Sequence, residues 1–148
     1  MPFFRTFYHF VWATKNRYPL ITEQNQHLIE RSIRASCKSL HVKMYALGHV
    51  SDHIHLAISL PPSLSCSKFA QQIKGASSHL VNHSPDDRQP TRDRFEWQTE
   101  YGVLTFGDRS LEDIVEYVDN QAIHHANGTL RPLFELTERE WQPRPTPS

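Results

Sequence analysis

Cysteine and long apolar runs are both scarce in this chain, and their scarcity excludes several classes of protein. Only Cys37 and Cys66 occur in 148 residues, too few for a disulfide framework and without metal-ligand spacing, so we expect both to be structural thiols. No apolar run approaches the roughly 18 residues that a membrane-spanning helix needs, and the N-terminal residues lack a signal-peptide pattern. We therefore expect a cytoplasmic protein without a membrane partner.

Net charge is absent as well, because 16 Lys and Arg residues balance 16 Asp and Glu residues. Residues 1–94 carry twelve basic and six acidic side chains, whereas residues 95–148 carry four and ten. This imbalance favours a basic patch on part of the surface, although a solvated surface of uneven charge explains the same numbers more simply. The length and the hydrophobic content of 38% predict a single compact domain over residues 1–148, with residues 143–148 as a frayed tail.

Alternating and helical patterns follow one another in an order that predicts the fold class. Strand-like alternation covers residues 4–14, 42–48, 52–60 and 95–106. Helical spacing covers residues 23–40, with Thr22 as a plausible N-cap, and residues 65–82. The order β-α-β-β-α-β is the ferredoxin-like pattern, an α+β fold in which two helices cover one face of an antiparallel sheet. Residues 84–94 contain two prolines and many charges, so we expect an exposed loop there.

One more helix is predicted on the C-terminal side. It begins near Ser110, where residues 110–113 (Ser-Leu-Glu-Asp) resemble a capping box, and it ends at Asn127-Gly128. The two earlier helices leave the second face of the sheet uncovered. We expect this last helix to cover it.

Two histidines share one face of the third predicted stretch of sheet. Side chains of a strand alternate between its faces, so His53 and His55 point the same way while Ile54 points to the core. Two imidazoles side by side form a platform for a divalent metal. A half-exposed pair of surface histidines without a metal would give the same pattern.

The last predicted helix carries a second group of reactive side chains. Tyr117, Gln121 and His124 lie at i, i+4 and i+7, and therefore on one face. A metal that polarises a phosphoryl oxygen would assist attack by the phenol, and Gln121 has a side-chain oxygen that can bind the same metal. The alternative is that Tyr117 packs against the sheet and Gln121 lies on the surface.

Together these pieces resemble the single-tyrosine HUH transposases of the insertion sequence 200/605 family. His53-Ile54-His55 is similar to the family's His-hydrophobe-His motif, and residues 116–121 are similar to its Tyr-x-x-Asn-Gln segment. His124-His125 resembles the palindrome-associated branch in particular. Further similarity is found in residues 8–17, 69–75, 97–98 and 101–102.

The resemblance implies roles for these residues in a metal-dependent DNA transposase, a mobile-element enzyme that cuts and joins single-stranded DNA at hairpins. Tyr117 would be the nucleophile and form a 5′-phosphotyrosine bond. His53, His55 and Gln121 would hold Mg²⁺ or Mn²⁺. Apart from the resemblance, Asp52 and His124 are candidates for positions just behind the ligands, where Asp52 would orient His53.

The resemblance also implies partners. Lys15, Arg17, Lys68 and Lys74 are candidates for contacts with the DNA backbone, with ordinary solvated charges as the alternative. The family implies a homodimer, in which the tyrosine acts on its own subunit or on the other one. Two other functions remain open: a catalytically idle, transposase-derived protein that binds hairpin nucleic acid, and an unrelated metal-binding domain that acts on a small molecule.

Overall fold

A four-stranded antiparallel sheet forms the centre of the computed structural model, which describes residues 2–84 and 94–137. The predicted tail at 143–148 and most of the predicted loop at 84–94 lie outside the described residues. The strands, in their order across the sheet, are β2 (Lys43–His49), β3 (His53–Ser59), β1 (Tyr8–Ala13) and β4 (Gly102–Thr105). This order, with helices between the strands as predicted, confirms the ferredoxin-like α+β fold.

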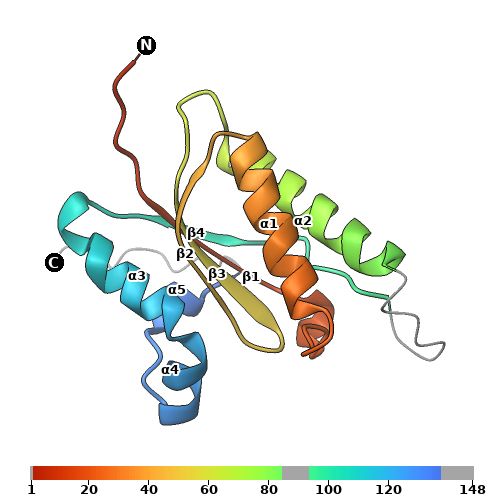
Figure 1. Ribbon diagram of the computed structural model, residues 1–148. Coiled ribbons are helices and arrows are strands. Elements are labelled where there is room, and N and C mark those ends of the chain that lie inside the picture. The colour runs from red at the N-terminus through yellow and green to blue at the C-terminus, as the bar shows by residue number, and fades with distance from the viewer. Residues whose placement is uncertain (1, 85–93, 138–148) are drawn as a thin grey trace, which may run out of the picture.

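Two long helices cover one face of the sheet, as Figure 1 shows. They are α1 (Gln26–Ser39) and α2 (Cys66–His83). Ile54, Leu56 and Ile58 of β3 point toward them and are fully buried in the larger apolar core, together with Phe10 and Phe69. Burial of such side chains stabilises a fold by about 1.5–3 kcal/mol each, so this core provides much of the driving force for folding.

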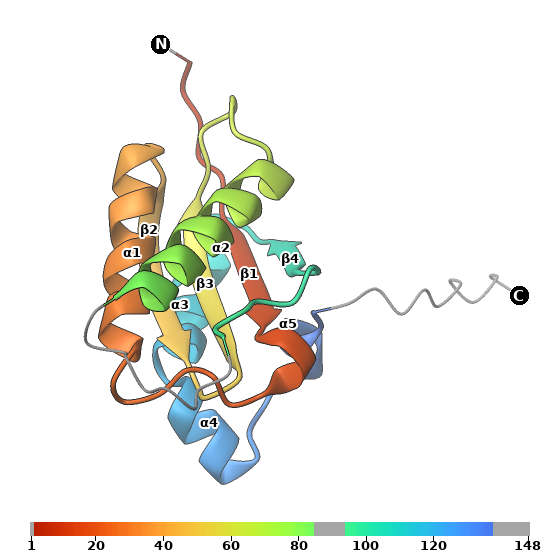
Figure 2. The same cartoon turned by 90° about the vertical axis from the view of Figure 1, so that its right-hand side faces the viewer.

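The C-terminal helices cover the opposite face, as Figures 1 and 2 show together. They are α3 (Leu111–Asp119), α4 (Gln121–Asn127) and α5 (Pro132–Glu135). A small apolar cluster joins α3 to the sheet through Ile114, Val118, Ala46 and Ala57. The prediction that the last helix covers this face is therefore confirmed.

The C-terminal helical region differs from the prediction in three respects. The single helix expected from Ser110 to Asn127 is divided at Asn120, whose backbone (φ −109°, ψ 31°) is not helical. The expected capping box does not form, because the Ser110 side chain makes no capping hydrogen bond and Asp113 pairs instead with Arg131. Helix α5 was not predicted, because one turn is too short to show periodicity.

Several predicted boundaries were too wide. Strand β1 begins at Tyr8 rather than at residue 4, and Phe4 at the predicted start is exposed. The last strand occupies only residues 102–105, and Trp97 forms an isolated bridge with Thr14. Helix α1 begins at Gln26 instead of residue 23. In the turn before it, the amides of Thr22 and Asn25 each donate to the side-chain oxygen of the other residue.

Lys74 fixes the irregular segment that leads into β4. Its ammonium group donates hydrogen bonds to the carbonyl oxygens of Gln98 (3.0 Å), Thr99 (3.3 Å) and Glu100 (2.8 Å). It also lies 5.6 Å from the ring centroid of Tyr101. Burial lowers the pKa of Lys74 to about 8. Because three carbonyls bend toward one cation, residues 98–100 cannot continue the strand.

Gly48 lets helix α3 approach the sheet closely. A Cβ atom at this position of β2 would lie 1.7 Å from the main-chain oxygen of Val118. Such an approach is impossible for any other residue unless the helix shifts. Gly75 on α2 offers a contrast, since a Cβ atom there would meet nothing within 4 Å.

We predict opposite effects of alanine at these two glycines. Gly48→Ala should lower the free energy of unfolding by about 1–3 kcal/mol, because α3 must move away from β2. Gly75→Ala should raise it by about 0.5–1 kcal/mol, since alanine is the better helix former. Urea denaturation of the two variants and the wild type measures both effects, and equal stability of the two variants would contradict the close approach.

We also predict that Lys74 stabilises the fold more than its neighbour on the same helix. Lys74→Met should lower the free energy of unfolding by about 1–3 kcal/mol, because three carbonyl oxygens lose a charged donor. Lys68→Met should change it by less than about 0.5 kcal/mol, since Lys68 is exposed. A comparison of their urea midpoints tests this; equal midpoints would mean that the Lys74 hydrogen bonds contribute little.

Candidate functional site

His53 and His55 lie side by side beneath the C-terminal helices. Both project from β3 to the same face, as predicted, and their ring centroids are 5.1 Å apart. They are almost completely buried, with exposed fractions of 3% and 0%. A half-exposed pair on the sheet surface is therefore not what the chain forms, and buried imidazoles need polar partners.

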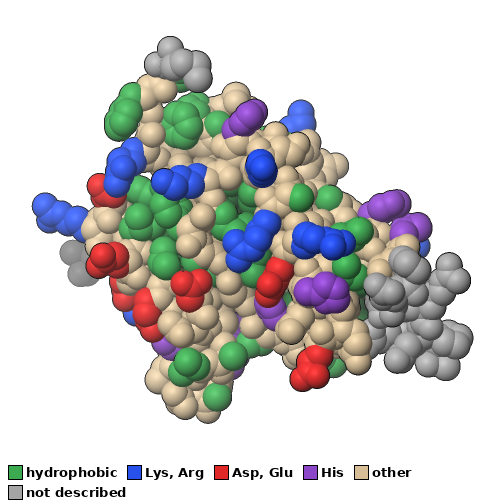
Figure 3. Space-filling view, viewed as in Figure 1, with side chains coloured by type: hydrophobic (Ala, Val, Ile, Leu, Met, Phe, Trp, Pro, Cys, Tyr) green, Lys and Arg blue, Asp and Glu red, His purple; other side chains and the backbone are tan. Residues whose placement is uncertain are grey.

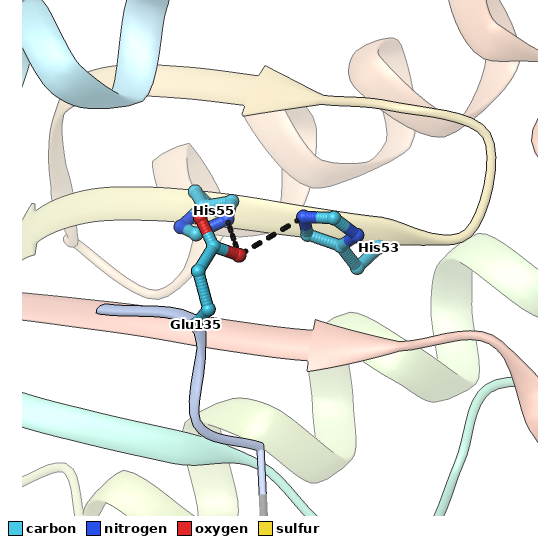
Figure 4. Close-up of side chains that lie close together, drawn as sticks. All are labelled: His53, His55 and Glu135. Carbon is cyan, nitrogen blue, oxygen red and sulfur yellow. Dashed lines mark hydrogen bonds and ion pairs between the residues drawn. The ribbon is translucent and has the colours of Figure 1, made fainter. Parts of the chain in front are cut away.

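Glu135 of α5 supplies a partner for both histidines (Figure 4). Its Oε2 atom lies 3.2 Å from Nε2 of His53 and 3.1 Å from Nε2 of His55. The ligand atoms of these three residues all lie within 4.8 Å of one another, so the cluster could hold a metal ion. Burial opposes ionisation of Glu135, but the hydrogen bonds from His53 and His55 outweigh it and keep the pKa of Glu135 below its ordinary value.

Tyr117 reaches the same carboxylate from helix α3. Its hydroxyl group donates to Oε1 of Glu135 at 2.6 Å and accepts a hydrogen bond from the backbone N–H of Arg131 at 3.0 Å. The ring is fully buried, and its centroid lies 6.0 Å from that of His55. Burial raises the pKa of Tyr117 to about 12, with a further contribution from Glu135, so the phenol is protonated at neutral pH.

Gln121 and His124 remain on the same side as Tyr117 although the helix is divided. Gln121 is the first residue of α4, and its Nε2 donates to the main-chain oxygen of Tyr117 at 2.9 Å. Its buried Oε1 has no hydrogen-bond partner among residues 2–84 and 94–137. His124 stacks on the Tyr117 ring at 4.8 Å. An unpartnered buried amide oxygen is a group that a nearby cation would satisfy.

Three more side chains hold the two histidines in place. Asp52 Oδ1 lies 2.7 Å from Nδ1 of His53, so the carboxylate fixes the orientation of that ring. Nε2 of His125 lies 3.0 Å from Nε2 of His53. Nε2 of His9 lies 2.8 Å from Nδ1 of His55.

The surroundings shift the pKa values of the histidines in different directions. Burial lowers the pKa of His9 to about 3, which keeps it neutral. Burial also lowers the pKa of His55. For His53, burial is outweighed by hydrogen bonds to Glu135 and Asp52, which raise its pKa.

Sequence reasoning did not identify Glu135 or His9 as site residues, and it named His125 only as part of the family resemblance. His9 could have been predicted from the sequence. Once β1 pairs with β3, its side chain lies on the same face of the sheet as His53 and His55. For Glu135 the sequence contains no comparable signal, because 80 residues separate it from His55.

The four basic residues predicted to contact DNA are not part of this cluster. Lys15 and Arg17 lie in the short helix η1 (Lys15–Arg17), where Lys15 pairs with Glu96 at 3.0 Å and Arg17 contacts Thr137 at 3.4 Å. Lys68 and Lys74 lie on α2, on the other face of the sheet. Figure 3 shows Lys and Arg side chains across the upper part of one face and acidic ones mostly below them.

Known proteins with similar sequences are transposases. A transposase of the insertion sequence element IS200 from Salmonella typhimurium (strain LT2) is 29% identical over 115 residues, which cover 77% of this chain and 75% of that protein. The ISDra2 transposase TnpA of Deinococcus radiodurans is 22% identical over 115 residues, covering 77% of this chain and 82% of that protein. In the described residues, no helix is long and apolar enough to cross a membrane.

Two solved structures share the fold. One, from Deinococcus radiodurans R1 and assigned to a transposase, superimposes with a TM-score of 0.62 at 25% identity and covers 82% of this chain and 95% of its own. The second is a REP-associated tyrosine transposase bound to a REP hairpin, with a TM-score of 0.62 at 15% identity over 84% of this chain and 74% of that one. At that identity the second likeness shows the fold alone.

The family assignment rests on a match that covers most of the chain. Residues 3–121 match the model of the family described as "Transposase IS200 like". That range includes both histidines of β3, Tyr117 and Gln121, and it ends before Glu135. The chain therefore belongs to the IS200-like transposase family.

Proposed function

We propose that this transposase cuts and rejoins single-stranded DNA, with Tyr117 as its nucleophile and a divalent metal held at His53 and His55. One observation carries the proposal. The Glu135 carboxylate contacts both histidines through one oxygen and the Tyr117 hydroxyl through the other, so the nucleophile lies next to the metal-binding pair. This arrangement needs only a single chain.

The residues present fit a divalent cation. Two imidazole nitrogens and the carboxylate of Glu135 make a mixed nitrogen and oxygen donor set. With the unpartnered amide oxygen of Gln121 as a further proposed ligand, this set suits Mn²⁺ or Mg²⁺. Gln121 keeps the ligand role that its position in the motif predicts. When bound, the cation would stabilise negative charge on a non-bridging oxygen of the scissile phosphate.

The chain's own residues perform the bond exchange. The Tyr117 oxygen forms a bond to the phosphorus and loses its proton, while the bond from phosphorus to the 3′ oxygen breaks and that oxygen leaves as a hydroxyl. The product is a 5′-phosphotyrosine bond. A second 3′-hydroxyl group can later attack this bond and release Tyr117, so the phosphodiester energy is conserved and ATP is not required.

The phosphate needs space that the DNA-free protein fills. Tyr117 is fully buried, and its hydroxyl group is enclosed by Arg131 and Glu135. Arg131 is itself held by Asp113, because its Nη2 atom donates to Oδ1 of Asp113 at 2.9 Å. We infer that DNA binding shifts the segment that precedes α5, so that the phosphate replaces the Arg131 contact.

Family membership supports the proposed substrate class. A structural relative was solved with a REP hairpin, and we propose that this chain also acts on single-stranded DNA beside a hairpin. Lys15, Arg17 and Lys68 are the proposed backbone contacts. Lys74 is a weaker candidate because its ammonium group is bonded to three carbonyls. A single domain over residues 1–148, a homodimer and a cytoplasmic location remain predictions.

We predict that Tyr117 forms the covalent bond to DNA. Wild-type protein with Mn²⁺ and labelled hairpin DNA should give an adduct that survives denaturing electrophoresis, and Tyr117→Phe should give none because the attacking oxygen is gone. Tyr18→Phe, at an exposed tyrosine, is the matched control and should react like wild type. Adduct from Tyr117→Phe at the wild-type level would refute the assignment. Hairpin binding without adduct in any variant would favour an idle binding protein.

We further predict that the two histidines of β3 support this reaction. His53→Ala and His55→Ala should each slow adduct formation by about 10²-fold or more, because transition-state charge loses its stabilisation. His27→Ala, at an exposed position on α1, should leave the rate unchanged. Single-turnover kinetics at fixed Mn²⁺ measures these rates, and equal slowing by all three variants would argue against a specific metal site.

A further inference from the structure

We propose that Glu135 joins the metal to the nucleophile in the DNA-free protein. Its Oε2 atom is a protein ligand of the ion held by His53 and His55, and its Oε1 atom holds the hydroxyl group of Tyr117. This inference rests on the proposed function. It adds an anionic ligand from outside the segment that matches the family, and it makes the C-terminal helix α5 part of the active site.

The distances fit a coordination shell. Two atoms bound to one ion at about 2.1 Å lie about 3.0 Å apart at an octahedral edge and about 3.4 Å apart at a tetrahedral edge. Oε2 of Glu135 lies 3.2 Å from His53 Nε2 and 3.1 Å from His55 Nε2, within that interval. One oxygen therefore stands at ligand spacing from both imidazoles. The Gln121 amide nitrogen donates to the main-chain oxygen of Tyr117, and its Oε1 atom has no hydrogen-bond partner among the described residues.

The charge balance also favours a carboxylate in this place. The side chain of Glu135 is only 18% exposed, and a buried carboxylate needs a cation or several donors to compensate the loss of water. A divalent cation would compensate Glu135 and would also leave the imidazoles neutral, the form in which they bind metals.

Packing fixes the position of Glu135 from both sides. The ring centroid of Phe134 lies 5.2 Å from that of His9 and 5.2 Å from that of Tyr117. The residue before Glu135 therefore packs between β1 and α3. On the other side, a Cβ atom at Gly102 of β4 would lie 1.9 Å from the main-chain oxygen of Leu136. The sheet thus has a glycine where the chain after α5 crosses it. Glu135 is held over the histidines by these contacts.

The role of Tyr117 follows from the second oxygen. A phenol on a helix can rotate about its side-chain bonds, and the hydrogen bond of 2.6 Å to Oε1 restricts it to the side of the histidines. Glu135 is thus a positioning residue for the nucleophile as well as a ligand. Loss of its charge should weaken metal binding, and loss of the side chain should also release Tyr117.

Mn²⁺ binding to the full-length, DNA-free protein tests the proposal. Isothermal titration calorimetry, with electron paramagnetic resonance of free Mn²⁺ as a second readout, should show one site in the wild type. Glu135→Gln, which keeps the shape and removes the charge, should weaken Mn²⁺ binding by about tenfold or more. Glu135→Asp should recover part of the affinity. Glu112→Gln, an exposed carboxylate on α3, is the matched control and should bind like wild type.

The outcomes separate this inference from the proposed function. If His53→Ala abolishes Mn²⁺ binding and Glu135→Gln leaves it unchanged, Glu135 is not a ligand and the proposed function stands. If neither His53→Ala nor His55→Ala alters Mn²⁺ binding, both proposals fail. Faster adduct formation by Glu135→Gln at unchanged Mn²⁺ affinity would overturn the inference too, since the carboxylate would then only occupy the place of the phosphate. Weaker binding that Glu135→Asp partly restores is the expected result.

Discussion

The alternation of side chains along β3 is the constraint on which the rest of this structure depends. Each step along the strand turns a side chain to the other face, so Ile54 and Leu56 enter the main core while His53 and His55 face the C-terminal helices. Because both faces are covered, the imidazoles are buried with the core residues. Burial makes partners necessary, and Asp52, His9, His125 and Glu135 provide them.

Features that depend on residues close together in the sequence could be predicted, and features that depend on distant residues could not. The histidine pair and the spacing of Tyr117 to Gln121 follow from periods of two and 3.6 residues, and both were found. The break at Asn120 was missed, because neither proline nor glycine occurs between Ser110 and Asn127 to mark it. Glu135 was missed because its contact with His55 depends on the path of the chain after Gly128 rather than on any local pattern.

The carboxylate of Glu135 links the segment that matches the family model to a helix that lies after this segment. The match to the family ends at residue 121, yet the side chain that contacts both histidines and the tyrosine comes after it. Burial and the contact with Glu135 raise the pKa of Tyr117, so its phenol is protonated at neutral pH.

The central claim is that two imidazoles and a phenol converge on one cation. A crystal structure of the protein with Mn²⁺, located by its anomalous scattering, tests this most directly. The account predicts a single ion bonded to Nε2 of His53 and of His55, with the Tyr117 hydroxyl group beside it. An ion bound elsewhere, or Tyr117 far from the ion in every subunit, would contradict the account.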